Sequence, residues 1–132
     1  MAIRTYRLGS AREAGEGVRL GTVRHPPRGV KKENHAAEGF YDAWLPELAP
    51  SAELVKWYLE EPASEARWAK FAKAYRREMH EPEYQRLLGV LARLSHQADF
   101  AVGCYCEDEN RCHRSILREL LAEQGARVGA SP

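Results

Sequence analysis

The segment from Cys104 to Arg114 gathers the residues of this chain that are best suited to covalent or metal chemistry. All three cysteines of the 132 residues lie in it, at positions 104, 106 and 112, and His113 and Arg114 follow them directly. A thiolate is a nucleophile and a metal ligand, an imidazole can accept a proton, and a guanidinium group holds carboxylates and phosphates. Because the cysteines are odd in number and clustered, we expect reduced thiols with a local role rather than a structural disulfide framework.

The first interpretation of this segment is an anion-binding active site with a reactive cysteine. Cys106 or Cys112 would be the reactive cysteine, and we take Cys112 as the candidate thiolate with Cys106 as its redox or resolving partner. His113 would be the nearby base and Arg114 the clamp for an oxyanion or phosphate, which completes the candidate catalytic set. A phosphatase loop is not supported, because that pattern places five residues between cysteine and arginine, whereas the sixth position after Cys106 is Cys112.

Two other interpretations stay open. Cys104, Cys106, Cys112 and His113 could bind zinc or iron, since three thiolates and one imidazole are a legitimate ligand set for zinc. Adjacent residues on a helix point about 100° apart, however, which makes joint ligation by Cys112 and His113 awkward. Alternatively, the cysteines are structural, and Cys104 in particular packs in the core at the end of an apolar run.

The helix that follows the cysteine segment sets the electrostatics of the site. Residues 107–111 are polar and form a turn, and Asn110 or Asp108 can cap the helix. With Asn110 as the cap, Cys112 and His113 lie in the first helical turn. The unpaired N–H groups and the dipole at that end favour negative charge, so a thiol there has a lowered pKa.

A second cluster of charge follows an earlier strand. Arg24, His25, Arg28, Lys31 and Lys32 lie in a loop, since Pro26, Pro27 and Gly29 end the strand before it. If the two strands are parallel neighbours, both loops open at the same edge of the sheet and form a positively lined pocket. We therefore take Arg24, His25 and Arg28 as candidate ligand-binding residues. The alternative is a solvated surface loop whose charges do nothing specific.

Alternation and helical periodicity predict the elements that position these loops. Strands are expected at 3–8, 18–23 and 99–104, the last buried on both faces, and a short strand at 126–128. Helices are expected after Ser51, after Ser64, from Pro82 and around Ile116 to Leu121, with Gly125 just past the end of the last. The helix after Ser51 would bury Leu54, Val55 and Tyr58, and Trp44 would also pack inward.

Strands alternating with helices predict an α/β sandwich with a central, mostly parallel sheet. We expect one domain over 1–132 with an ordered core at about 3–128.

Composition narrows the class of partner. Twenty basic residues oppose nineteen acidic ones, so the net charge of +1 gives no general attraction for nucleic acid. No apolar run approaches the roughly 18 residues of a membrane helix, and no signal-peptide core is present. We expect a cytoplasmic protein, either a small enzyme or a ligand-binding protein for an anionic small molecule. The alternative is a metal-holding or non-catalytic interaction module, and the cofactor, if any, stays open.

Several motifs resemble domain-of-unknown-function family 488, the YeaO-like group. They are Pro27-Arg28-Gly29, Trp44-Leu-Pro-Glu-Leu-Ala-Pro-Ser51, Phe71-x-x-x-Tyr75, and Cys106 with the Cys112-His113-Arg114 ending. The similarity runs in order over about residues 3 to 125. It implies a compact α/β domain with helices around a central sheet, and it assigns no substrate or cofactor. Many members carry Asp-Arg-Leu-Trp just before Pro-Arg-Gly, and here only Arg24 of that stretch remains.

Overall fold

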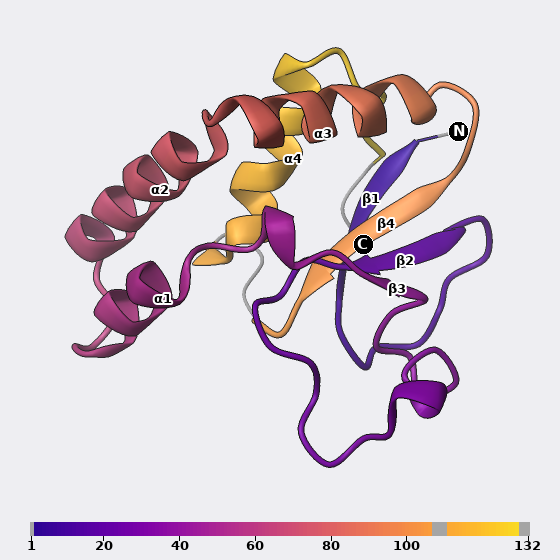
Figure 1. Ribbon diagram of the computed structural model, residues 1–132, viewed down its shortest axis with the longest axis horizontal. Helices are drawn as coiled ribbons and strands as arrows, with labels where there is room; N and C mark the ends of the chain where they lie inside the picture. The colour runs from indigo at the N-terminus through magenta and orange to yellow at the C-terminus, as the bar shows by residue number, and fades with distance from the viewer. Residues whose placement is uncertain (1, 107–110, 130–132) are drawn as a thin grey trace.

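The computed structural model describes residues 2–106 and 111–129. Four strands and four helices follow one another along the chain (Figure 1): β1 (Ile3–Arg7), β2 (Val18–Gly21), β3 (Ala43–Trp44), α1 (Ala52–Leu59), α2 (Glu65–Met79), α3 (Pro82–Leu94), β4 (Phe100–Cys104) and α4 (His113–Glu123). Two short 3₁₀ turns, η1 (Lys32–Asn34) and η2 (Pro46–Leu48), lie in the connections on either side of β3.

The strands form one parallel sheet in the order β1-β4-β2-β3. β4 is central and every one of its residues is buried, as its continuous apolar sequence predicts. Phe100 is the register partner of both Ile3 and Val18, so β4 joins the two early strands. The predicted α/β sandwich with a parallel central sheet is confirmed. β3 was not predicted, because a strand of two residues is too short to show alternation.

The helices begin where their capping residues indicate. The Ser51 side chain accepts a hydrogen bond from the Leu54 N–H, and the Ser64 side chain accepts one from the Arg67 N–H. Each bond satisfies one of the orphan donors of a first helical turn. At the other end of the chain, Gly125 has a φ of +88°, the left-handed conformation that commonly ends a helix.

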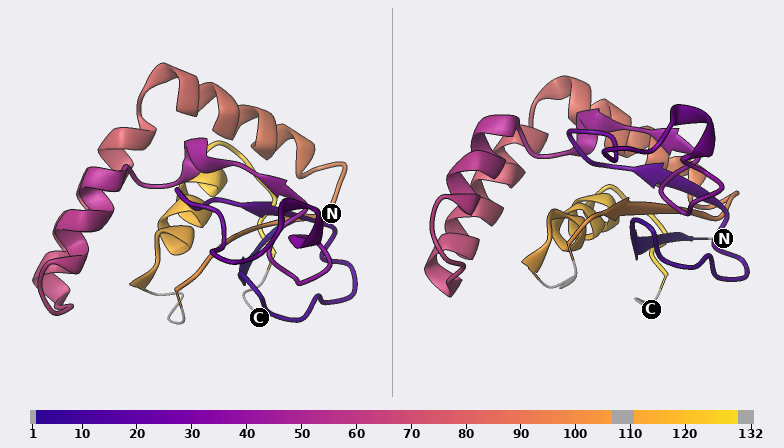
Figure 2. Two further views of the ribbon diagram at one scale, coloured as in Figure 1. Left: turned by 60° about the horizontal axis from the view of Figure 1, so that its bottom comes forward. Right: turned by 90° about the horizontal axis from the view of Figure 1, so that it is seen from below.

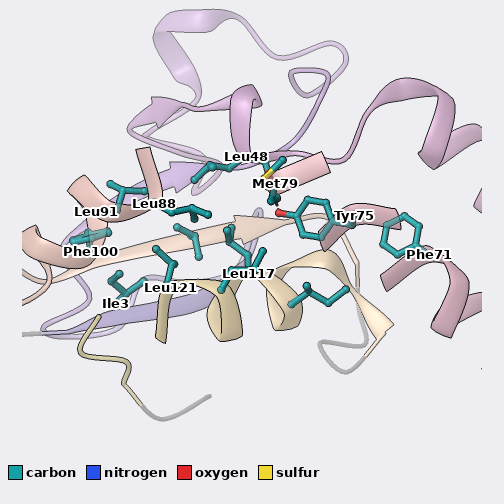
Figure 3. Close-up of a cluster of buried hydrophobic side chains, with 13 residues drawn as sticks. Ile3, Leu48, Phe71, Tyr75, Met79, Leu88, Leu91, Phe100, Leu117 and Leu121 are labelled. Carbon is teal, nitrogen blue, oxygen red and sulfur yellow. Dashed lines mark hydrogen bonds between the residues drawn. The ribbon is translucent and has the colours of Figure 1, made fainter. Parts of the chain in front are cut away.

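The main core fills the space between the sheet and α2, α3 and α4 (Figure 3). Side chains from these elements point toward one another there, among them Ile3, Phe100, Leu88, Leu117 and Tyr75, all 6% exposed or less. The Tyr75 hydroxyl donates a 2.6 Å hydrogen bond to the Leu48 carbonyl and so ties α2 to η2. The periodicity of α2, α3 and α4 predicts one apolar face on each helix, and these faces are buried in the structure.

The smaller core lies on the other face of the sheet and includes Tyr6, Tyr41 and Ala101. Two glycines make room for its rings. A Cβ on Gly103 would lie 2.5 Å from the Tyr6 ring, and a Cβ on Gly21 would overlap the ring of Tyr41. These close approaches explain why strands that are otherwise rich in larger residues carry glycine at these positions.

α1 and α2 form a pair that extends beyond the sheet, on the side of the molecule toward which β4 runs (Figures 1 and 2). The expected burial of Leu54, Val55 and Tyr58 holds only in part: all three are half-buried, and Leu54 and Tyr58 pack against the edge of the main core. Trp44 is likewise 44% exposed rather than packed inward, and its indole N–H donates to the Val23 carbonyl at 2.7 Å.

Within the described ranges, no helix has the length and apolar character needed to span a bilayer.

Candidate functional site

The candidate site lies where β2 and β4 end. Because these neighbouring strands are parallel, the chain leaves both at the same edge of the sheet. Val23, Arg24 and His25 follow β2, and Tyr105 and Cys106 follow β4. The Tyr105 hydroxyl donates to the His25 carbonyl at 3.3 Å, which places the two loops directly beside each other.

A cavity of about 310 Å³ opens between these loops and the α1–α2 pair. One side is formed by Arg24, His25, Tyr105, Arg111, His113 and the three cysteines, and the other by Pro50, Val55, Tyr58, Leu59, Trp68 and Phe71. The cavity therefore brings thiols, cationic side chains and an apolar wall together. Its volume falls within the range of about 300–1,000 Å³ that small-molecule sites occupy.

The three cysteine sulfurs converge in this cavity and lie within 4.8 Å of one another. A disulfide joins Cys104 to Cys112, whose side chains are each 1% exposed, while Cys106 is exposed. The expectation of three reduced thiols is therefore wrong for this state, and the sulfur bonded to Cys112 is that of Cys104 rather than Cys106. The reason is geometric: β4 ends at Cys104, and the return of the chain into α4 brings Cys112 back against that strand end.

The Cα atoms of Cys104 and Cys112 are 7.6 Å apart. Disulfides ordinarily form over Cα separations of about 4.4–6.8 Å. Backbone positions this far apart also suit two separate thiols that face a shared centre.

Cys112 is itself the N-cap of α4, with extended backbone angles of φ −126° and ψ 147°. The residues expected to cap this helix, Asp108 and Asn110, lie outside the described residues. α4 therefore begins at His113, one position after the cysteine, and not before it. A thiolate at an N-cap lies next to the unpaired N–H groups and the positive end of the helix dipole, both of which lower a thiol pKa.

His113 is buried and electrically neutral. Its Nε2 lies 2.7 Å from the Thr22 carbonyl, which can only accept, so Nε2 carries the proton and Nδ1 holds the lone pair. Burial lowers the His113 pKa to about 4, with a smaller contribution from the nearby Arg114 charge, although the bond to Thr22 acts in the opposite direction. Its ring also meets the edge of Tyr75, with the centroids 5.6 Å apart. The nitrogens of His113 are not part of the group formed by the three sulfurs.

Arg114 points away from the thiols. Its side chain is buried, donates from Nη1 to the Tyr6 carbonyl at 2.9 Å, and lines a different cavity, of about 270 Å³, together with Arg4, Glu16 and Arg19. The arginine that does line the thiol cavity is Arg111, which the sequence did not single out. The signal for it was the polar turn before α4, because a residue there can face the end of the strand that precedes the turn.

Of the three candidate ligand-binding residues, two line the thiol cavity and one does not. Arg24 and His25 line the thiol cavity, whereas Arg28 is exposed and lies outside its lining. The Arg24 guanidinium donates to the Ala49 carbonyl at 3.0 Å and to the Pro50 carbonyl at 3.3 Å, through Nη2 and Nε. These bonds hold the guanidinium at the cavity with Nη1 still able to donate.

Comparison with known proteins places this architecture in a family. The model of DUF488-N3a, the active DUF488-N3 subclade, matches residues 3–125. An uncharacterized protein of Mycobacterium bovis, Mb3100c, is 26% identical over 119 residues, which cover 90% of this chain and 92% of that protein. The uncharacterized protein Rv3073c of Mycobacterium tuberculosis is similar to the same extent. No solved structure matches the chain significantly.

Proposed function

We propose that this chain, which belongs to the DUF488-N3a family, is a cytoplasmic thiol-dependent protein that binds a small anion in the cavity between its β2 and β4 loops. The observation that carries the proposal is that one cavity is lined both by Cys104, Cys106 and Cys112 and by the cationic Arg24 and Arg111. The resemblance to family 488 drawn from the sequence is confirmed by the family match, and the function is our own inference.

In this proposal Cys112 is the nucleophile. Its position as the N-cap of α4 favours the thiolate. His113, the base expected from the sequence, is neutral, but its nitrogens lie outside the sulfur group and burial lowers its pKa, so the thiolate in this proposal depends on the helix N-terminus. The set also differs from the one expected from the sequence in its cation, since Arg111 and Arg24 take the place proposed for Arg114.

The disulfide between Cys104 and Cys112 is then the oxidised form of the site. A dithiol reductant opens it by exchange: the reductant becomes a disulfide, and Cys104 and Cys112 each take up a proton as thiols. Cys106, exposed and within 4.8 Å of both sulfurs, can attack the same disulfide and serve as a resolving thiol. Activity therefore requires reducing conditions.

Thiol reactivity as a function of pH tests this assignment. In fully reduced protein, the rate of alkylation by iodoacetamide should reveal one thiol whose pKa lies well below the ordinary value of about 8.5. Cys112→Ser should remove this component, whereas Cys106→Ser should leave it. Inorganic phosphate should slow the reaction of Cys112 if the anion binds beside it. Ordinary pKa values for all three thiols would contradict the proposed nucleophile.

A metal centre is the second candidate, and the convergence of three sulfurs favours it. Tetrahedral zinc with bonds of about 2.3 Å holds its sulfur ligands roughly 3.8 Å apart, which the three cysteines can reach. His113 would not be the fourth ligand in this arrangement, because its Nε2 is bonded to Thr22 and its ring lies outside the sulfur group. One equivalent of zinc or iron after reducing purification, with fewer than three reactive thiols, would favour this candidate. Three reactive thiols without metal would favour the thiolate.

A further inference from the structure

The helix α1 presents more apolar surface than its packing covers. Leu54, Trp57 and Tyr58 pack partly against the main core, whereas Val55 and Leu59 lie outside it, and no residue of the helix is fully buried. Leu59 is 73% exposed. Since the exposure of such a cluster costs free energy in water, an apolar surface of this kind commonly marks a binding site.

Part of this surface forms the apolar wall of the thiol cavity. Val55, Tyr58 and Leu59 of α1 line it together with Trp68 and Phe71 of α2. The rings of Trp68 and Phe71 are stacked, with centroids 5.4 Å apart and planes 21° apart. Tyr58 meets Phe71 at a centroid distance of 4.8 Å. The wall is therefore a surface of adjoining aromatic faces and branched aliphatic side chains, which suits a planar apolar group.

Two arginines and a histidine lie among the residues on the opposite side of the cavity. Arg24, His25 and Arg111 line it, and no acidic residue is found among the described residues of the lining. Among residues 2–106 and 111–129, Arg111 has an ion-pair partner in Glu65 at 3.9 Å, and the Glu65 side chain is 94% exposed, so the pair is screened by water. The Arg111 charge is therefore only weakly compensated by Glu65.

The volume sets the size of the ligand. A dry cavity of about 150 Å³ accommodates one benzene molecule in another protein. The thiol cavity, at about 310 Å³, is roughly twice that size. It accepts a body of one or two fused rings with one small polar substituent.

We infer that the ligand of this site is a small aromatic acid, with a planar body against Tyr58, Trp68 and Phe71 and one carboxylate or phosphate group held by Arg24 and Arg111. The inference rests on the proposed function, since it names the class of anion that the thiol cavity takes. The anionic group lies on the side of the cavity where the cysteines converge, so the atoms next to that group are the ones presented to the Cys112 sulfur.

Binding of four probes to the reduced full-length protein tests the ligand class by isothermal titration calorimetry. 2-Naphthoate and 2-naphthyl phosphate carry both the rings and the charge, 2-naphthalenemethanol carries only the rings, and inorganic phosphate carries only the charge. We expect at least one of the two charged naphthalenes to bind tenfold or more tightly than both of the partial probes. The better of the two identifies the anionic group as a carboxylate or a phosphate.

Two variants locate the ligand, each with a matched control. Leu59→Glu places a negative charge on the apolar wall at an exposed position and should weaken binding of the charged naphthalenes at least tenfold, while Val90→Glu, at the similarly exposed Val90 on α3, should not. Arg111→Gln should weaken them toward the affinity of 2-naphthalenemethanol, while Arg93→Gln, an exposed arginine of α3, should not.

The outcomes separate this inference from the function on which it rests. If inorganic phosphate binds as tightly as 2-naphthyl phosphate, the aromatic class is overturned and the anion site stands. If no anionic probe binds, both the class and the proposed anion site fall. If 2-naphthalenemethanol binds as tightly as the charged naphthalenes, the proposal that the ligand carries an anionic group is overturned. A dimer that Leu59→Glu dissociates and 2-naphthoate does not disturb would assign the wall to a second copy of the chain, and would also overturn the inference.

Discussion

Acidification should destabilise this protein through His113 at a pH well above the range in which its carboxylates are protonated. The imidazole pKa is about 4 in the folded protein, against an ordinary value of 6.5. Because the folded pKa is the lower one, the unfolded chain takes up the proton first as the pH falls. The stability that His113 contributes is therefore complete above about pH 6.5 and is lost progressively down to about pH 4.

The size of the effect follows from the shift. At about 1.36 kcal/mol per pKa unit, the whole change is about 3 kcal/mol, of which roughly 2 kcal/mol is lost between pH 7.5 and pH 5.0. Protonation of Glu16 and Asp42 also destabilises the protein. Burial raises the pKa of Glu16, but its hydrogen bond from Arg19 and other contacts outweigh this, and the hydrogen bond from Arg12 lowers the pKa of Asp42. Their ordinary values are 4.5 and 3.8, so most of their loss comes below pH 5. The interval from 7.5 to 5.0 therefore isolates the histidine.

Urea unfolding of reduced protein at the two pH values measures the loss. His113→Gln is the test variant, since the glutamine amide can reach the position of Nε2, donate to Thr22 and never titrate. It should lose about 2 kcal/mol less than the wild type over the interval. His80→Gln, at an exposed position, is the control and should match the wild type. An equal loss in His113→Gln, or an NMR titration that shows His113 protonated near pH 6.5, would refute the reasoning.

Two further predictions concern the scaffold that holds the site. Tyr75→Phe should lower the free energy of unfolding by about 1–3 kcal/mol in urea, because it leaves the buried Leu48 carbonyl without its donor. Tyr84→Phe on α3 should change it by less than about 0.5 kcal/mol, since its half-buried hydroxyl has no hydrogen-bond partner among residues 2–106 and 111–129. Gly21→Ala should cost about 1–3 kcal/mol because the added methyl overlaps the Tyr41 ring. Gly89→Ala lies in the interior of α3, where Gln124 Oε1 would be 3.8 Å from the added Cβ, an ordinary contact. It should instead raise the free energy of unfolding by about 0.5–1 kcal/mol, and a decrease would contradict the helix-propensity argument.

The sequence predicted most of the elements because their signals are local. Ser51 and Ser64 marked helix starts through hydrogen bonds within one turn, and the unbroken apolar run of β4 indicated a strand covered on both faces. Periodicity also gives the apolar face of a helix, but not whether another element covers that face. The expected apolar face of α1 is therefore only half-buried against the core, and Val55 and Tyr58 of that face line the cavity.

The candidate site was predicted in its location and only in part in its members. The ends of parallel neighbouring strands must lie together, so Arg24 and the cysteine segment could be placed near each other from the sequence. The direction of Arg114 could not, because it depends on the rotation of α4 about its own axis against β1. The bond between Cys104 and Cys112 was missed for a similar reason, since it depends on how the start of α4 lies against the end of β4.

The central position of β4 has a consequence for the synthesis of the protein. β1 and β2 are made early, yet each finds its principal neighbour only in β4, whose residues are Phe100–Cys104. A nascent chain that ends before this strand can pair β2 only with the two residues of β3. Sheet formation must therefore wait until Phe100–Cys104 have been made, and such long-range pairing is characteristic of slower folding. Cys104 is the last residue of the strand that closes the sheet, so the thiols meet the cationic loop only after the fold has formed. A nascent chain that ends before β4 therefore has no assembled site.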